Sequence, residues 1–193
     1  MNICVYGASG EHLDRRYFDA AEELGRLIAQ SGHSLIFGGG AGGLMGACAR
    51  GAERAGGEII GVAPRFFDEP GVLFDRCTRF IYTDTMRERK QIMEDESDAV
   101  IALPGGIGTF EEFFEMLTLK QLGRHTKPMA VLNTLGYYEP MRRMLSAAAE
   151  GAFMSCSCFE LFSFCSTPAE ALTYVRSAPV ISGSLKRLAD YAK

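Results

Sequence analysis

Three times in this chain of 193 residues, a short apolar segment runs into a glycine-rich turn and then into a stretch with helical spacing. The turns lie at residues 7–10, 38–46 and 105–108. Short apolar runs that contain β-branched residues and stop at proline or glycine are typical of strands buried on both faces. Strands that alternate with helices in this way predict a mainly parallel sheet.

The other segments continue the alternation, without an internal repeat, low-complexity tract or linker. The predicted strands span residues 2–6, 34–37, 58–62, 79–82, 99–103, 129–132 and 161–164. The predicted helices span residues 14–31, 44–55, 86–93, 110–123, 137–150, 169–175 and 181–191, and residues 65–76 are predicted to form a loop. The sequence therefore predicts one α/β domain over residues 1–193, with a Rossmann-like, doubly wound sheet and helices on both faces.

The composition is that of a globular protein without a nucleic-acid or membrane partner. Hydrophobic residues make up 47% and charged residues 23% of the chain, and the net charge is -4 with no basic block. The apolar runs are too short to span a bilayer, and a strand predicted from residue 2 leaves no room for a signal peptide. The six cysteines form no CxxC pair and there are three histidines, so we expect free thiols, a cytoplasmic location and no metal site.

The three glycine turns predict a binding crevice. The carboxyl ends of parallel strands meet at one edge of a sheet, and ligands bind there at the point where the strand order reverses. In the third turn, Gly105, Gly106 and Gly108 allow backbone amides to approach a ligand closely. Thr109 is predicted to cap a helix that begins near Phe110, and the free amides and dipole of that helix favour an anion such as phosphate.

Charged residues near the third turn allow two interpretations. Glu112 lies at capping-box spacing from Thr109, so its carboxylate either returns to the Thr109 amide or faces the crevice. Arg89 and Lys90 lie on the helix that precedes the 99–103 strand. They either pair with a phosphate or with Glu112, or form a solvated basic face that nearby acidic residues balance.

Other polar residues have local explanations as well as functional ones. Thr85 and Glu88 are at capping-box spacing for the 86–93 helix. Ser9, in the first glycine turn, either binds a hydroxyl or phosphate group of a ligand or makes a bond within the turn. The chain contains no G-x-S-x-G elbow of the kind that serine hydrolases use.

Several motifs resemble one known family. Residues 104–112, with the sequence PGGIGTFEE, resemble the PGGxGTxxE motif of the Lonely Guy family of cytokinin riboside 5'-monophosphate phosphoribohydrolases, which are often labelled lysine decarboxylases. The GGGAGGLMG segment at residues 38–46 is similar to that family's glycine turn, and MRERK at residues 86–90 is similar to its M-x-x-R-K segment. The similarity extends over residues 2–175. Further matches lie at residues 121–128 and 133–138.

The resemblance implies hydrolysis of the N-glycosidic bond of a nucleoside 5'-monophosphate, which yields a free base and ribose 5-phosphate. It also implies a Rossmann-like fold, commonly a homodimer, and a reaction without a metal or organic cofactor. By motif position, Arg89 and Glu112 are the expected catalytic residues. The candidate substrate-binding residues, taken from the glycine turns and from the resemblance, are Ser9, Gly39, Gly40, Lys90, Gly105, Gly106, Ile107, Gly108, Thr109, Glu111 and Thr118.

Four features depart from the usual pattern of the family and leave the identity of the base open. Arg87 stands where many members have His, Ile107 replaces a common aromatic residue, and Leu119 stands where Trp is frequent. The first glycine turn, at residues 7–10, has the sequence GASG where the family has a Ser-Ser form. The expected substrate is therefore either AMP or an N6-prenylated analogue of AMP.

Three other functions compete with this interpretation. A housekeeping hydrolase of the AMP nucleosidase type would act on plain AMP. A molybdenum-cofactor carrier of similar fold would bind its ligand without turnover, and the presence of Arg89 and Glu112 favours hydrolysis over that function. A lysine decarboxylase would need pyridoxal phosphate and a Schiff-base lysine, which makes it the weakest of the alternatives.

The helix after the third turn also bears on the oligomeric state. Its phenylalanine-rich face, which includes Phe113 and Phe114, is predicted to pack on the sheet. Met116, Leu119 and Leu122 are predicted to lie on the other side of the helix. A helix that is apolar on two sides favours burial on both, for example by the partner subunit of a homodimer.

Overall fold

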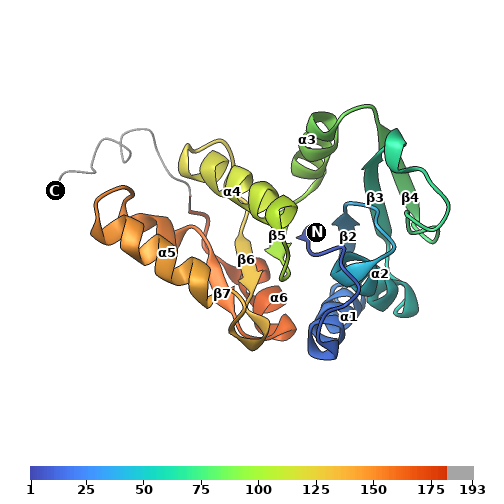
Figure 1. The fold of residues 1–193 in the computed structure, drawn as a ribbon, viewed down its shortest axis with the longest axis horizontal. Helices are drawn as coiled ribbons and strands as arrows, with labels where there is room; N and C mark the ends of the chain where they lie inside the picture. Colours follow the sequence, from blue (N-terminus) through green and yellow to red (C-terminus); the bar gives the residue numbers. More distant parts are fainter. Residues whose placement is uncertain (182–193) are drawn as a thin grey trace.

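The computed structural model describes residues 1–181, which form a single domain around a seven-stranded sheet (Figure 1). The strand order is β4-β3-β2-β1-β5-β6-β7, and each pair of neighbouring strands is parallel. This confirms the predicted α/β fold. The strands are β1 Asn2–Tyr6, β2 Ser34–Phe37, β3 Ile59–Pro64, β4 Arg79–Thr83, β5 Ala99–Ala102, β6 Met129–Leu132 and β7 Ser163–Cys165.

The strand order reverses between β1 and β5. From β1 the chain builds outward through β2, β3 and β4, and it then returns to place β5 on the other side of β1. The chain therefore leaves β1 toward β2 and leaves β5 toward β6, in opposite directions along the sheet. Such a point is where open parallel sheets bind their ligands, and the first and third glycine turns lie on either side of it.

Helices cover both faces of the sheet, as predicted. In Figure 1, α1 and α2 lie below the central strands, and α3 and α4 lie above them. Successive side chains of β1 point to opposite faces of the sheet. Ile3 and Val5 belong to the apolar cluster on one face, and Cys4 and Tyr6 belong to the cluster on the other. The helices of the first layer are α1 Arg15–Gln30, α2 Gly43–Arg54 and α6 Pro168–Ser177. Those of the second are α3 Met86–Glu96, α4 Ile107–Gln121 and α5 Glu139–Glu150.

The small residues of α2 allow it to pack directly on α1. A Cβ atom added to Gly51 would lie 1.9 Å from the carbonyl oxygen of Glu22, and one added to Gly25 would lie 1.9 Å from that of Cys48. The two backbones are therefore in contact, which fits the alanine- and glycine-rich composition of α2. This packing fixes the direction in which α2 leaves the second glycine turn.

The start of α4 differs from the prediction. The helix begins at Ile107 with Gly106 as its N-cap, and no side chain makes a capping bond there. Thr109 lies inside the first turn, where its hydroxyl packs against Gly105. The extended backbone of Gly106 ends the preceding turn without help from a threonine cap. The capping box at Thr85 and Glu88, by contrast, is present as predicted.

Other boundaries differ in smaller ways. A 3-10 turn at Thr134–Gly136, in which Leu135 adopts the left-handed conformation, delays the start of α5 to Glu139. A second 3-10 segment, Cys156–Glu160, delays the last strand to Ser163. Met116 belongs to the core and does not lie on a second apolar side of α4. Most of the helix predicted at 181–191 lies outside the described residues.

Within residues 1–181, every helix is too short or too polar to cross a membrane.

Candidate active site

One residue bonds the three glycine turns to each other. The Ala8 amide donates to the carbonyl oxygen of Pro104 at 3.0 Å, which joins the first turn to the third. The Ala8 carbonyl oxygen accepts from the Leu44 amide at 2.8 Å, which joins the first turn to the second. The prediction that the three turns line one crevice is therefore confirmed.

A cavity of about 570 Å³ opens between these turns. This volume is typical of a site for a small molecule. Its lining combines exposed backbone of the turns with an ion pair and several apolar side chains. The lining residues include Ser9, Glu11, Gly38, Gly40, Met45, Phe67, Val72, Leu73, Met86, Arg89, Gly106, Ile107, Gly108, Thr109 and Glu112.

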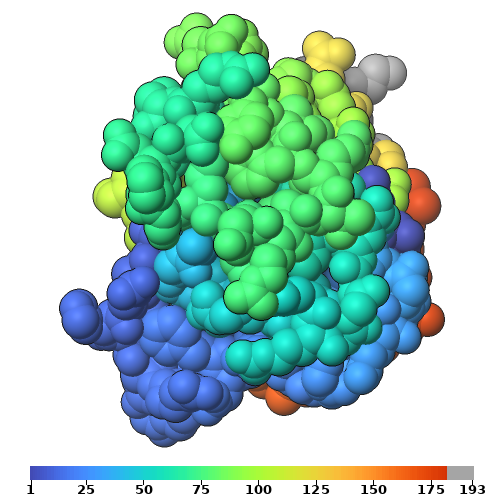
Figure 2. All heavy atoms as spheres, turned by 90° about the vertical axis from the view of Figure 1, so that its right-hand side faces the viewer, coloured from blue at the N-terminus to red at the C-terminus, as the bar shows by residue number. Residues whose placement is uncertain are grey.

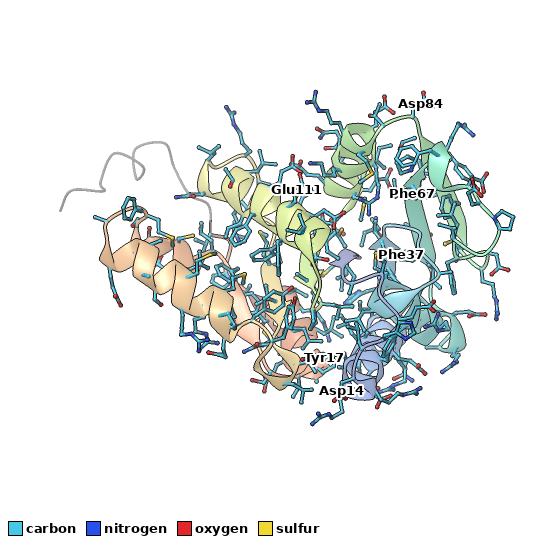
Figure 3. The ribbon with its side chains drawn as sticks, in the orientation of Figure 1. Asp14, Tyr17, Phe37, Phe67, Asp84 and Glu111 are labelled. Atoms are coloured by element: carbon cyan, nitrogen blue, oxygen red, sulfur yellow. The ribbon has the colours of Figure 1, made fainter. Side chains whose placement is uncertain are left out.

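The segment between β3 and β4 forms one wall of the cavity. Its backbone is held to the second glycine turn, because the Ala41 amide donates to Val72 at 2.9 Å and the Phe74 amide donates to Gly39 at 2.8 Å. In Figure 2, this segment and α3 (turquoise to green) cover the molecule above α1 (blue). Phe67, labelled in Figure 3, comes from the start of the same segment. The sequence predicted a loop here but gave it no role.

The centre of the site is an ion pair between α3 and α4. Arg89 Nη1 donates to Glu112 Oε1 at 2.6 Å, and the two side chains are only 8% and 9% exposed. Arg89 Nε donates to the Val62 carbonyl oxygen at 3.2 Å, which anchors the guanidinium to β3. A Cβ on Gly38 would lie 2.1 Å from Arg89 Nη2, so the second glycine turn makes room for this arginine. Glu112 thus pairs with Arg89. The alternative prediction, that its carboxylate returns to the Thr109 amide, is wrong.

Burial and the ion pair act on the Glu112 carboxyl in opposite directions. Removal from water raises the pKa of Glu112 above its ordinary value, and the positive charge of Arg89 limits that rise. A carboxylate with a raised pKa is a better proton acceptor than one in water. Glu112 is thereby suited to accept a proton or to stabilise a positive charge in the cavity.

The first turn of α4 supplies an anion site next to this pair. The first amides of a helix have no acceptor within the helix, and Gly106 offers none from a side chain. Ile107, Gly108 and Thr109 line the cavity, so these amides and the positive end of the helix dipole lie at its wall. A phosphate group bound there would lie within one helical turn of Glu112.

Lys90 and Glu111 form a second link between α3 and α4, outside the cavity. Lys90 Nζ bonds to Glu111 Oε1 and lies 2.8 Å from Glu115 Oε2. Figure 3 shows Glu111 on the side of α4 that faces α3. The neighbouring residues Arg89 and Lys90 thus pair with the neighbouring residues Glu112 and Glu111, one pair buried and the other nearer to solvent.

The structure separates the predicted substrate-binding residues into two groups. Those that line the cavity are Ser9, Gly40, Gly106, Ile107, Gly108 and Thr109. Those that do not are Gly39, Lys90, Gly105, Glu111 and Thr118. Thr118 is exposed and lies about three helical turns beyond the start of α4, so α4 carries it away from the cavity.

Several residues that line the cavity were not predicted from the sequence. Glu11 directly follows the first glycine turn, so proximity to that turn was an available signal. Val72 and Leu73 reach the cavity through backbone hydrogen bonds to the second turn, which leave no signature in side-chain type. Met86 is the first residue of α3, one turn before Arg89, and its place at the cavity follows from the position of that arginine.

Solved structures with this fold include molybdenum-cofactor proteins. The molybdenum cofactor binding protein of Rippkaea orientalis aligns with a TM-score of 0.69 at 26% identity, over 91% of this chain and 94% of that chain. The molybdenum cofactor carrier protein of Chlamydomonas reinhardtii aligns with a TM-score of 0.68 at 28% identity, over 91% and 95% of the two chains.

Curated relatives are more similar in sequence. The cytokinin riboside 5'-monophosphate phosphoribohydrolase of Rhodococcoides fascians is 39% identical over 163 residues, which are 84% of this chain and 82% of the relative. The Arabidopsis thaliana enzyme LOG2, of the same name, is 36% identical over 153 residues, or 79% and 72% of the two chains. A family model described as possible lysine decarboxylase matches residues 45–175. By this similarity, which extends over most of both sequences, the chain belongs to the family of cytokinin riboside 5'-monophosphate phosphoribohydrolases.

Proposed function

We propose that this protein hydrolyses the N-glycosidic bond of AMP or of an N6-substituted AMP, releasing the base and ribose 5-phosphate. The buried pair of Arg89 and Glu112, placed beside the open amino end of α4, is the observation that carries this proposal. It brings together an anion site and a carboxylate within about one helical turn of each other on the wall of one cavity. The names of the relatives support the same substrate class.

The amino end of α4 binds the 5'-phosphate in this proposal. Amides of residues 107–109 donate to its oxygens, and the helix dipole favours its charge. Binding energy gained at the phosphate holds the ribose in place, which lowers the entropic cost of reaching the transition state. Ser9, across the cavity on the first turn, offers a hydroxyl to the bound nucleotide.

Glu112 acts at the anomeric carbon. As the bond from C1' to the base nitrogen breaks, positive charge develops on the ribose, and a nearby carboxylate stabilises it. The same carboxylate orients the attacking water and accepts its proton, while the water oxygen bonds to C1'. The departing base takes up a proton, so the net reaction consumes one water. Arg89 holds Glu112 in place and contributes positive charge to substrate binding.

The apolar part of the lining supports an N6-substituted base. Met45, Phe67 and Met86 line the cavity from three different elements, and Ile107 adds an exposed side chain at its rim. These side chains can cover an alkyl group attached to the base. AMP itself stays a candidate, because the same walls accept an unsubstituted adenine.

Carrier function is the second candidate, because solved structures of molybdenum-cofactor carriers share the fold at 26–28% identity. A carrier needs an anion site but no buried, pKa-shifted carboxylate in its cavity. The environment of Glu112 therefore favours hydrolysis.

A decarboxylase that uses pyridoxal phosphate does not fit the cavity. Such an enzyme needs a lysine positioned to form a Schiff base. Among the described residues, no lysine lines the cavity: Lys90 is engaged by two carboxylates, and Lys120 donates to the Leu161 carbonyl oxygen at 2.7 Å.

The oligomeric state and location belong to the same proposal. The expectation of a homodimer comes from the resemblance to the family. Half-buried Leu119 and Leu122 and the exposed Phe153 provide apolar surface for a partner subunit. A cytoplasmic location rests on the free cysteines, of which four are buried. Light scattering tests the dimer, and a monomeric mass would contradict it.

A substrate panel tests the function. The protein is incubated with AMP and with isopentenyl-AMP, and the products are separated by chromatography. Release of free base together with ribose 5-phosphate supports hydrolysis, and the faster of the two nucleotides identifies the preferred base. Tight binding without products would contradict the hydrolase and support a carrier.

A further inference from the structure

Each backbone carbonyl oxygen at residues 103–105, which lead into the third glycine turn, accepts a hydrogen bond. Tyr138 Oη donates to the Leu103 oxygen at 2.7 Å, the Ala8 amide donates to the Pro104 oxygen at 3.0 Å, and Tyr137 Oη donates to the Gly105 oxygen. The next carbonyl, that of Gly106, accepts from the Phe110 amide within α4. Each oxygen along this stretch is therefore engaged by a donor of the protein itself.

The bond to Gly105 also sets the direction of the next amide. The Gly105 carbonyl and the Gly106 N–H belong to one planar trans peptide, so they point in opposite directions. Tyr137 draws the carbonyl to its own side, and the Gly106 N–H is thereby directed away from Tyr137. Gly106 itself lines the cavity. Because a peptide between two glycines has little conformational preference of its own, the bond from Tyr137 helps to select this orientation.

Tyr137 is itself firmly held. Its ring makes edge-to-face contacts with Tyr17, at 6.2 Å between centroids, and with Tyr138, at 5.0 Å. Leu135, two residues earlier, has φ of +55°, a conformation that a leucine adopts only when its surroundings impose it. Asn133 Oδ1 accepts from the Tyr138 amide at 2.7 Å and closes the turn. The connection between β6 and α5 is thus built to present two tyrosine hydroxyls to the third glycine turn.

We infer that Tyr137 is a positioning residue for phosphate recognition: its hydroxyl fixes the Gly105–Gly106 peptide so that the Gly106 N–H joins the amides of α4 around the phosphate. This inference rests on the proposed function, since it assumes that the anion in the turn is the nucleotide's 5'-phosphate. Tyr137 does not line the cavity and acts only through the peptide that it holds.

The test compares Tyr137→Phe with Tyr17→Phe. Tyr137→Phe removes one hydroxyl and keeps the ring, and Tyr17→Phe removes a hydroxyl from the other member of the same ring contact. Affinity for AMP and for adenosine is measured by calorimetry in proteins that also carry Glu112→Gln, so that AMP is not consumed, and kcat and KM for AMP are measured with Glu112 in place. Loss of one amide bond to a charged group predicts about a tenfold rise in the Kd and KM for AMP in Tyr137→Phe. Its adenosine affinity and kcat, and both affinities of Tyr17→Phe, are expected to stay within about threefold of wild type.

Two results would overturn the inference. One is an unchanged AMP affinity in Tyr137→Phe, and the other is an equal loss for AMP and adenosine, which would indicate general damage to the fold. Wild-type protein that binds both ligands equally would also overturn it, because no phosphate site would then exist. Wild-type protein that prefers AMP but releases no base would contradict only the proposed reaction, and the binding comparison would still decide the role of Tyr137.

Discussion

Arg89 and Glu112 meet at 2.6 Å although they lie on different helices and 23 residues apart in the sequence. Both helices cover the same face of the sheet, and both begin at the edge where the glycine turns gather. An ion pair with so little exposure is costly to form unless each partner is held in place, because both charges lose their water. Here β3 holds the arginine through the Val62 carbonyl oxygen, and α4 holds the glutamate.

Replacement of Glu112 by glutamine is the most direct test of its role. Glu112→Gln keeps an oxygen acceptor for Arg89 but removes the charge and the proton acceptor. We expect kcat for the preferred nucleotide to fall on the order of 10³-fold. The free energy of unfolding should also fall, because the buried Arg89 guanidinium loses its counter-charge, but the fold is expected to survive. Product chromatography and thermal unfolding measure the two effects, and retained turnover in a folded variant would rule out the mechanism.

The pH dependence of turnover should report the same carboxyl. Because burial raises the pKa of Glu112 above its ordinary 4.5, the carboxylate becomes protonated, and turnover is lost, at a higher pH than for a solvated glutamate. The acid limb of kcat/KM for AMP, which reports the ligand-free enzyme, is therefore expected above pH 4.5. Arg89→Gln removes the charge that limits this rise, so the acid limb of its residual activity should move further up. An unmoved limb in that variant would contradict the coupling.

The sequence predicted the scaffold well because strong local signals determine it. The alternation of apolar runs with helical segments specified the parallel sheet, and the glycines marked the ends of β1, β2 and β5. The capping box at Thr85 and Glu88 was visible because both of its bonds are made within one helical turn. These features depend on residues that are close together in the chain.

Features that depend on distant contacts were not visible. Glu112 had a local bond and a remote partner available to it, and only the packing of α3 against α4 decides between them. The wall at Val72 and Leu73 depends on backbone bonds to the second turn. The left-handed Leu135 breaks the usual preference for glycine, so residue type gave no warning of that turn. Local pattern left the pairing of Arg89 with Glu112 as one of several alternatives, and the resemblance to a known family favoured it.

Lys90 offers a test of whether the outer link between α3 and α4 is structural. Its ammonium group is engaged by Glu111 and Glu115 and lies outside the cavity lining. Lys90→Met should therefore lower the free energy of unfolding by about 1 kcal/mol, as for a partly exposed ion pair, and change the KM for AMP less than twofold. Lys90→Arg, which keeps the charge, serves as the control. A large rise in KM for the Met variant alone would show that Lys90 leaves its carboxylates to contact the phosphate.

Lys120 should impose a pH dependence on stability that is separate from catalysis. Its side chain is 2% exposed, and burial lowers its pKa from 10.5 to about 8. Between these values the unfolded chain binds a proton that the folded protein does not, so Lys120 makes the protein more stable as the pH rises through this window. The shift corresponds to about 3 kcal/mol of stability gained between pH 7 and pH 10.

Buried thiols act in the opposite direction, because burial raises the pKa of Cys4 and Cys48 to about 12 and so weakens the fold at alkaline pH. The contribution of Lys120 is therefore read from the difference between wild type and Lys120→Met, which keeps an apolar side chain of similar length. Urea unfolding under reducing conditions at pH 7 and pH 10 should show wild type gaining about 3 kcal/mol relative to the variant. Parallel stability curves would mean that Lys120 keeps an ordinary pKa despite its burial.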